Sequence, residues 1–320
     1  MGALSGLTLR LRPSPALQSR VRGAAQGQQI TYGTEEESMR TGIFYYHQKG
    51  ERLRDFPQAL KGILEKENIF FYDAFYPSKP PSSFKLEPIS SEMLYQIHSH
   101  ELVEEVTKTG NFEGALFSVA GTVRAAEKIW MEEIDNAFVF TGYGDHHAGT
   151  IFFGGGCYFN GAAIAIRTLR KRFGAKRFAI IDTDAHHGDG TWEIFEADPD
   201  VLYVCFCSDH YLEKNNKVNI QVPTRIIDEE YLELVRNNFF SRVMAFQPEI
   251  FFWNWGYDGS QGDYGDIGLT PDFHILLTNE LKGLANKICR GRLIVVLCGG
   301  SRRDLARTLI PEMIKVISEE

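Results

Sequence analysis

The chain has 320 residues, of which 43% are hydrophobic and 12% aromatic, so it is long enough to bury a large core. Its formal net charge of −8 argues against non-specific binding to nucleic acid and mildly favours cationic substrates. No stretch approaches the roughly 18 uninterrupted apolar residues that a membrane span needs, so we expect no membrane insertion.

The first 38 residues differ from the rest of the chain. They contain four arginines before Gly33, no acidic residue up to that point, no clear apolar period and no apolar region of the kind that secretory signals carry. We therefore predict that residues 1–38 are a disordered or spurious extension, with Met39 as the natural start. An Arg-rich organelle transit peptide is the alternative interpretation.

From residue 41 onward, short apolar runs rich in β-branched and aromatic residues alternate with longer segments of helical period. This alternation predicts an α/β fold with a mostly parallel sheet, and we expect residues 39–320 to form one domain. Asn160, Thr270-Pro271 and Asp304 stand near expected helix starts. The expected strands are 42–46, 69–73, 137–141, 178–182, 201–206, 249–254 and 293–298, and the expected helices are 101–108, 115–132, 158–172, 229–245, 272–288 and 303–318.

The cysteines indicate a reducing compartment. They lack paired CxxC spacing and lie mostly inside apolar runs. Buried free thiols, and with them a cytoplasmic protein, are the prediction for all five cysteines, at 157, 205, 207, 289 and 298.

Polar and charged residues follow four of the expected strands. They occur in "VFTGYGDHHAG", "IDTDAHHGDG", "FFWNWGYDGSQGD" and "VVLCGGSRRD". In an open parallel sheet, ligands and catalytic groups gather at the carboxyl ends of the strands. We therefore expect these four segments to face one crevice.

Asp184 and His186 are two residues apart on an extended segment, so both side chains point to one side of the chain. Together they offer a carboxylate oxygen and an imidazole nitrogen to a metal ion, and Asp258, beyond a different strand, is the best candidate for a third ligand. Three ligands of this type leave a position for water, as in a catalytic zinc site. The alternative is that these residues cap the next helix or pair with arginines.

His146 and His147 are adjacent in an expected loop. Water activated by a metal needs a neighbouring base, and histidine titrates in the useful range. Asp182 and Asp189 could each hold one imidazole by its other nitrogen and fix its tautomer. The alternative is that the two histidines are ordinary polar loop residues.

Four motifs in this order, "DHHAG", "DTDAHHGDGT", "GYDGSQGDYGDIGLT" and "LCGG", resemble the histone deacetylase family, and the third looks most like class II and prokaryotic members. "YQIHSHELVEEV" and "GCYFNGAAIA" are weaker similarities, and the resemblance extends over residues 41–320. It implies a single-domain, three-layer α/β/α arrangement, the arginase/deacetylase fold, with residues 39–320 as the catalytic domain.

The resemblance also implies roles for individual residues. Asp184, His186 and Asp258 would bind one zinc ion per chain, and a structural monovalent cation would lie near Asp182. His146 and His147 would form the general acid/base pair. In that pair Asp182 would hold His146 by a hydrogen bond, and Asp189 would hold His147 in the same way.

The implied reaction is hydrolysis of an acylated lysine in a protein, or of a related acylated small amine. Two alternatives stay open. One is a catalytically weak member of the fold that binds acyl-lysine or another ligand without efficient turnover, and the more distant one is a manganese-dependent ureohydrolase.

The chain departs from the family at two places. Family deacetylases usually carry a tyrosine after the last glycines, where its hydroxyl donates to the oxyanion. This chain has "CGGSRRDLA", and we assign Arg302, or Arg303 by the other count, to that position at the mouth of the metal site. Arg302 would support the oxyanion or select an acidic acyl group, unless the arginines face solvent or pair with Asp304 or Glu312.

Tyr257 or Tyr143 is then an alternative source of an oxyanion donor, and we include Tyr257 among the substrate-binding residues. At the second departure, Gly156 stands where many members carry an aromatic residue in the wall of the lysine channel, so we predict a wider channel there. Residues 207–217 are expected to line its entrance, with His210 or Tyr211 as an aromatic contact.

Overall fold

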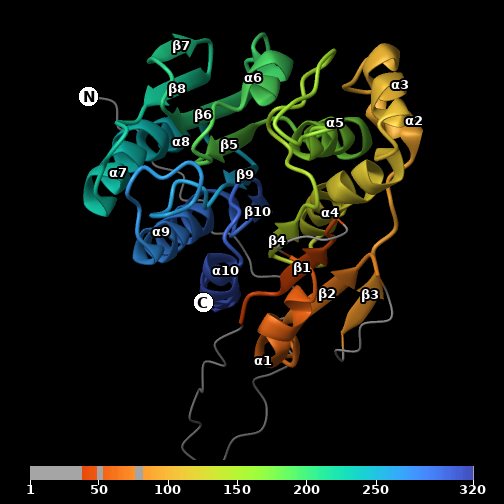
Figure 1. Ribbon diagram of the computed structural model, residues 1–320, viewed down its shortest axis with the longest axis horizontal. Coiled ribbons are helices and arrows are strands. Elements are labelled where there is room, and N and C mark those ends of the chain that lie inside the picture. Colours follow the sequence, from red (N-terminus) through yellow and green to blue (C-terminus); the bar gives the residue numbers. More distant parts are fainter. Residues whose placement is uncertain (1–37, 49–52, 76–81, 320) are drawn as a thin grey trace, which may run out of the picture. The chain divides into compact units, whose positions relative to one another are not determined.

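A ten-stranded sheet in the order β3-β2-β1-β4-β10-β9-β5-β6-β8-β7 organises the computed structural model (Figure 1). All neighbouring strands run parallel except β7 and β8, which are antiparallel. The predicted α/β fold with a mostly parallel sheet is confirmed. The strands are β1 (Thr41–Tyr45), β2 (Ile69–Asp73), β3 (Ser83–Lys85), β4 (Asn136–Phe140), β5 (Phe178–Asp182), β6 (Val201–Cys207), β7 (Leu212–Lys214), β8 (Lys217–Gln221), β9 (Ile250–Trp255) and β10 (Leu293–Leu297).

The structure describes residues 38–48, 53–75 and 82–319. They belong to one unit of the chain, Glu37–Glu320. The extension predicted at residues 1–38 lies outside the described residues except for Ser38, so the interpretation of that segment stays a prediction.

Two apolar clusters, one on each face of the sheet, hold the layers together. Along β5, Ala179 and Ile181 pack into one cluster and Phe178 and Ile180 into the other, because successive strand residues point to opposite faces. Both faces of the central strands are therefore buried, which explains why those strands are continuous apolar runs.

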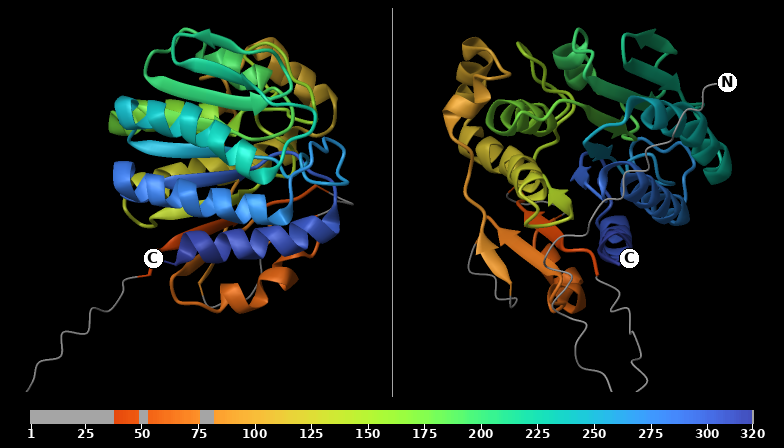
Figure 2. Two further views of the ribbon diagram at one scale, coloured as in Figure 1. Left: turned by 90° about the vertical axis from the view of Figure 1, so that its left-hand side faces the viewer. Right: turned by 180° about the vertical axis from the view of Figure 1, so that it is seen from behind.

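Helices cover both faces of the sheet. The first face carries the 3-10 helix η2 (Phe56–Leu60), α1 (Lys61–Leu64), α7 (Asp228–Val235), α8 (Ser241–Phe246), α9 (Pro271–Cys289) and α10 (Arg303–Ser318), of which α7, α9 and α10 run side by side in Figure 2. The second face carries α2 (Ser91–Leu94), α3 (His100–Lys108), α4 (Phe112–Trp130), α5 (Gly161–Phe173) and α6 (Asp189–Phe195). No helix in the described part of the chain is both long and apolar enough to cross a membrane.

The predicted helix starts are present. The Asn160 side chain accepts a hydrogen bond of 3.0 Å from Ala163 N at the beginning of α5. Pro271 is the first residue of α9, where its missing N–H has no intrahelical partner to lose, and Asp304 lies in the first turn of α10. The helix expected at 229–245 is present as a continuous helical segment made of α7, a π-helical turn over Arg236–Phe240, and α8.

The seven expected strands are all present, with ends within one residue of the prediction, but β3, β7 and β8 were missed. β8 reads KVNIQ, and the polar side chains of Lys217 and Asn219 are buried in it. Lys217 Nζ donates to Val201 O at 2.9 Å, and Asn219 Nδ2 donates to His210 O at 2.8 Å. Hydrogen bonds thus stabilise a strand in which the polar positions are buried as well as Val218 and Ile220, so its short polar–apolar alternation does not mark an exposed face.

Candidate active site

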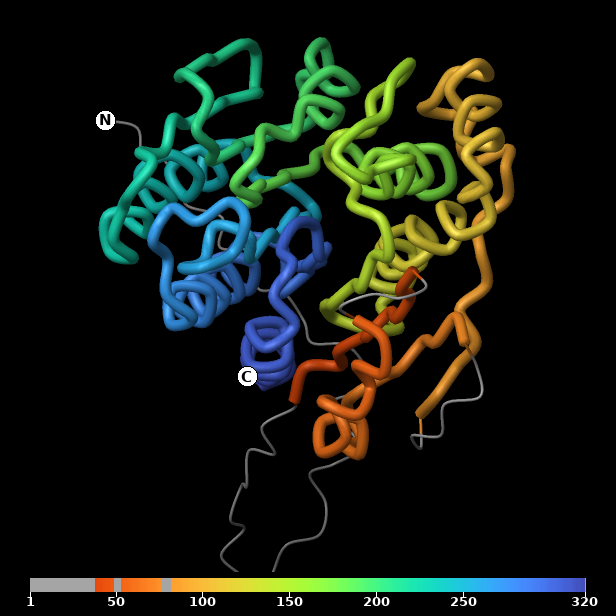
Figure 3. Tube along the Cα trace, in the orientation of Figure 1, coloured from red at the N-terminus to blue at the C-terminus, as the bar shows by residue number. Residues whose placement is uncertain are grey.

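The four polar segments meet at one edge of the sheet, as predicted. They follow β4, β5, β9 and β10, and β10 lies between β4 and β9 in the sheet (Figure 3). Residues from all four segments or the turns that follow them line a cavity of about 460 Å³, among them His146, Asp184, Tyr264 and Gly300. This volume is in the range of ordinary small-molecule sites.

Asp184, His186 and Asp258 form a cluster at this cavity. One potential ligand atom from each lies within 4.8 Å of the others. His186 Nδ1 is 3.0 Å from Asp184 Oδ1 and 2.9 Å from Asp258 Oδ2. The two carboxylates are buried, whereas the imidazole is half-exposed, so the cluster opens toward solvent through His186.

These residues fit a divalent metal ion. Asp258 Oδ2 is buried and lacks a hydrogen bond of standard geometry despite its distance to His186. Glycines surround the carboxylates: a Cβ at Gly256 would lie 2.5 Å from Asp184 Oδ2, and one at Gly265 would lie 3.1 Å from Asp258 Oδ2. Two buried carboxylates, one with an unsatisfied oxygen, beside a half-exposed imidazole nitrogen suit zinc.

The electrostatics of the cluster support this fit. Burial, followed by the charge of Asp184, raises the pKa of Asp258 to about 7. Hydrogen bonds to the two carboxylates raise the pKa of His186 to about 10. Burial opposes ionisation of Asp184, but His146 and His186 outweigh it and hold the pKa of that carboxyl well below its usual range. The carboxylates thus favour a positive charge between them, which a divalent cation supplies more strongly than a proton does.

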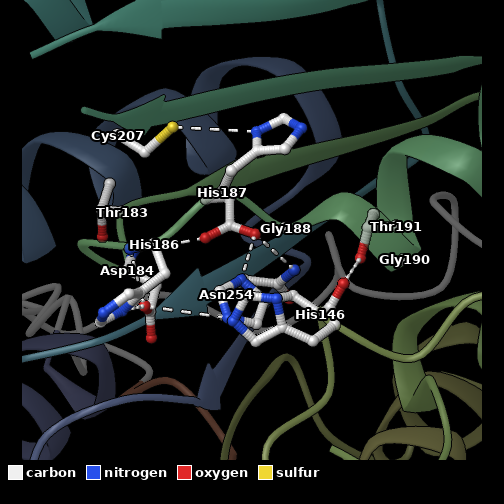
Figure 4. Close-up of polar contacts among 12 residues, drawn as sticks. His146, Thr183, Asp184, His186, His187, Gly188, Gly190, Thr191, Cys207 and Asn254 are labelled. Carbon is white, nitrogen blue, oxygen red and sulfur yellow. Dashed lines mark hydrogen bonds and ion pairs between the residues drawn. The ribbon is translucent and has the colours of Figure 1, made fainter. Parts of the chain in front are cut away.

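His146 and His147 lie side by side, with ring centroids 4.1 Å apart. His146 is buried, and its Nε2 lies 3.8 Å from Asp184 Oδ1 (Figure 4). Its Nδ1 lies 3.0 Å from Asp182 Oδ2. His147 is partly exposed, and its Nδ1 lies 2.7 Å from Asp189 Oδ1. The structure therefore brings each histidine to the aspartate that the resemblance assigned to it.

Asp182 anchors this part of the site. Besides His146, its Oδ2 accepts hydrogen bonds from Tyr203 Oη at 2.9 Å and from Asn254 Nδ2 at 3.1 Å. Burial disfavours a charged His146, but the carboxylates around it, Asp182 first, raise its pKa to about 10. The monovalent cation expected near Asp182 stays a prediction.

A second group of potential metal ligands follows His186 in the structure. His187, Cys205 and Cys207 present ligand atoms within 4.8 Å of one another, and Cys207 Sγ is 3.8 Å from His187 Nδ1 (Figure 4). Asn219 Oδ1 accepts from the Cys207 thiol at 3.1 Å. All five cysteines are free and buried, as predicted. The spacing of Cys205 and Cys207 on one strand face could have predicted this pair.

Gly156 lines the cavity, and a Cβ built on it would meet no atom within 4 Å. The wall is therefore open at this point. Its φ of +82° lies in the left-handed region that favours glycine. The segment 207–217 does not line this cavity; it forms the end of β6 and the β7–β8 hairpin.

The structure corrects the predicted position of Arg302. Its guanidinium pairs with Asp304, donates to Gln261 O at 2.9 Å, and does not line the cavity. Ser301, directly after the second glycine, lines it instead. Arg302 is the residue before α10, so its side chain turns outward to the first helical turn.

Tyr257 is also misplaced in the prediction. Its side chain is fully buried in the core beside Trp255, and its ring would collide with a Cβ on Gly300. The ring of Tyr257 packs against Gly300 on the core side and does not face the cavity. Sequence reasoning missed Tyr264, which does line the cavity, because nothing in its spacing distinguishes it within the motif.

Comparison with known proteins identifies the family. Residues 103–317 match the histone deacetylase domain, so the chain belongs to the histone deacetylase family. It is 30% identical over 269 residues to a probable deacetylase of Archaeoglobus fulgidus, with 75% of this chain and 71% of that protein covered.

Eukaryotic relatives are similar over much of this chain, and one solved structure shares its fold. The chain is 28% identical to histone deacetylase 15 of Arabidopsis thaliana, with 72% of this chain and 47% of that protein covered. It is 29% identical to histone deacetylase 6 of Caenorhabditis elegans, of which it spans 24%. The crystal structure of the HDA15 HD domain superimposes with a TM-score of 0.71 at 22% identity, covering 87% of this chain and 88% of that one, which shows a shared fold.

Proposed function

We propose that this chain is a zinc-dependent amide hydrolase that removes acetyl or other acyl groups from lysine side chains or related amines. The observation that carries the proposal is the convergence of a buried Asp-His-Asp cluster and an aspartate-backed histidine pair on one cavity. Zinc bound by Asp184, His186 and Asp258 would polarise the acyl carbonyl and lower the pKa of water.

The histidine pair supplies the proton transfers. Water adds through its oxygen to the carbonyl carbon while one of its protons passes to an imidazole of the pair. The C–N bond then breaks as an imidazole returns a proton to the leaving nitrogen. The products are a carboxylic acid, which is acetate for an acetyl group, and a free amine.

The aspartates that contact the histidine pair determine which imidazole nitrogen transfers the proton. Asp182 and Asp189 each face an Nδ1 atom, which leaves the Nε2 atoms of His146 and His147 for the reaction. Asp184 and Asp258 help to raise the pKa of His146 and are also the candidate metal ligands. Loading the site neutralises part of their field and favours the neutral imidazole that a base requires.

The experiment is a turnover assay of the zinc-loaded full chain. Substrates are peptides with acetyl-lysine or succinyl-lysine, and acetylated polyamines, with release of the acid as the signal. We expect turnover that disappears on chelation, returns with zinc, and falls by about 10²–10⁴ in His146→Ala. The control is His100→Ala, which removes an imidazole stacked on Tyr95 outside the cavity.

The alternative function is binding without efficient turnover. It is favoured by Ser301, which is too short to replace the phenol that family deacetylases present after the last glycines. Micromolar binding of acyl-lysine peptides by the zinc-loaded chain, with no acid released from any substrate, would support this alternative and contradict the hydrolase.

A further inference from the structure

We propose that Tyr264 is a catalytic residue that donates a hydrogen bond from its hydroxyl to the acyl carbonyl oxygen. In this chain, a tyrosine from the segment after β9 would thus donate the hydrogen bond that, in family deacetylases, comes from a tyrosine after the last glycines. The inference rests on the proposed function and concerns the same cavity.

The position of the phenol carries the inference. Tyr264 lines the cavity, and its ring stacks on the imidazole of His186 with centroids 5.5 Å apart and planes at 29°. Its hydroxyl oxygen accepts a hydrogen bond of 3.1 Å from Gly300 N. One residue earlier, Gly299 N donates to Asp184 Oδ2 at 2.6 Å. The phenol oxygen therefore lies next to the segment that holds a candidate metal ligand.

Neighbours on both sides hold Tyr264 in place. Asp263 accepts hydrogen bonds from Tyr264 N at 2.8 Å, from Ser301 Oγ at 2.7 Å and from Arg302 N at 2.9 Å. Burial opposes ionisation of Asp263, but these donors lower its pKa overall, so the carboxylate that ties the two segments stays charged. On the other side Gly265 N donates to Asp258 O at 3.1 Å. Such preorganisation is what an oxyanion donor needs.

Other hydroxyl groups at the cavity are less suited to this role. Ser301 Oγ donates to Asp263, and Tyr143 Oη donates to Asn111 Oδ1 at 3.0 Å. A phenol can both accept a hydrogen bond from a backbone N–H and donate one to a carbonyl oxygen, and the accepted bond strengthens it as a donor. Tyr264 is 60% exposed, so an acyl group that enters the cavity can reach it.

The test is Tyr264→Phe, which removes only the hydroxyl. We expect kcat/KM to fall by about 10²–10³, mainly in kcat, with KM within about twofold and zinc content unchanged. Tyr95→Phe is the matched control, because that exposed tyrosine lies outside the cavity and should keep wild-type kinetics. Retention of more than half of the wild-type kcat/KM in Tyr264→Phe would overturn the inference.

A second measurement keeps the test independent of turnover. An alkyl hydroxamate places a carbonyl oxygen beside the metal, so calorimetry on the zinc-loaded protein should show about 10-fold weaker binding to Tyr264→Phe than to wild type. If the wild type hydrolyses none of the substrates, the proposed function fails. The hydroxamate affinities of wild type and Tyr264→Phe then still test whether Tyr264 donates a hydrogen bond. Equal affinity for both proteins then overturns its role as a donor.

Discussion

His147 Nδ1 lies 2.7 Å from Asp189 Oδ1, although Asp189 is the more exposed of the two aspartates that face the histidine pair. The contact turns the Nε2 atom of His147 toward the cavity, where a Cβ on Gly155 would lie 2.9 Å from it. When the Nδ1–H group of His147 donates to a carboxylate, the imidazole is held in the tautomer whose Nε2 can accept a proton.

We therefore expect Asp189→Asn to lower kcat by about 10–100-fold while zinc content stays the same, because an amide holds the imidazole less firmly and stabilises its charged form less. Steady-state kinetics with an acetyl-lysine peptide measure this. Asp200→Asn is the control, since Asp200 is exposed and lies outside the cavity. A change of less than twofold in Asp189→Asn would show that the contact does not assist the reaction.

Replacement of Asp258 by alanine should empty the metal site. Two of the three ligands would remain, and we expect zinc content to fall from one ion per chain to near zero after dialysis. Elemental analysis measures it, with Asp304→Ala as the control, because this exposed carboxylate pairs with Arg302 outside the cavity. Full retention of zinc by Asp258→Ala would remove Asp258 from the ligand set.

Arg302→Tyr should leave acetyl-lysine turnover within about twofold of wild type. The guanidinium of Arg302 pairs with Asp304 outside the cavity, so its loss neither removes nor adds a donor at the acyl oxygen. The same assay on Arg302→Tyr checks this. A tenfold rise in turnover would instead restore the assignment of position 302 to the family tyrosine.

Asp145 should make stability depend on pH. Its carboxyl is fully buried, neither oxygen makes a side-chain hydrogen bond of standard geometry, and burial raises its pKa from 3.8 to about 7 despite the N–H groups of Gly161 and Ala162. Between these two values the folded chain keeps a proton that the unfolded chain releases. Its contribution is therefore fully present below about pH 4 and is lost as the pH rises to 7.

Asp145→Asn removes this loss, because an amide stays neutral throughout. We expect the melting temperature of the variant relative to wild type to be higher at pH 8 than at pH 5, measured by thermal unfolding in matched buffers. The difference between the two pH values cancels any packing effect of the amide itself. An identical relative melting temperature at both would contradict a raised pKa of Asp145.

The sequence was sufficient to predict the central strands and the edge at which the polar segments meet. Those strands are buried on both faces and are therefore mostly apolar, and parallel strands place their carboxyl ends together. β8 was missed because the burial of its polar residues Lys217 and Asn219 depends on hydrogen bonds to the backbone carbonyls of Val201 and His210, which composition does not reveal.

The direction of individual side chains was the other feature that the sequence did not predict. Tyr257 directly precedes Asp258, and Arg302 directly follows Ser301, yet the two side chains of each pair lie in different surroundings. Asp258 and Ser301 face the metal cluster or cavity, whereas Tyr257 enters the core and Arg302 turns toward solvent. Motif matching located the segments, but it did not decide which neighbour faces inward.

The place of β10 in the sheet has a consequence for how the site is assembled during folding. β10 is the last strand in the sequence, and it joins β3-β2-β1-β4 on one side to β9-β5-β6-β8-β7 on the other. His146 and His147 follow β4, whereas Asp184 and His186 follow β5 and Asp258 follows β9. Within the sheet, the histidine pair and the candidate metal ligands therefore stay on separate halves until residues 293–297 have been synthesised and inserted. Such long-range pairing is slow to form, and until then β4 and β9 each present an open edge on which a nascent chain can aggregate.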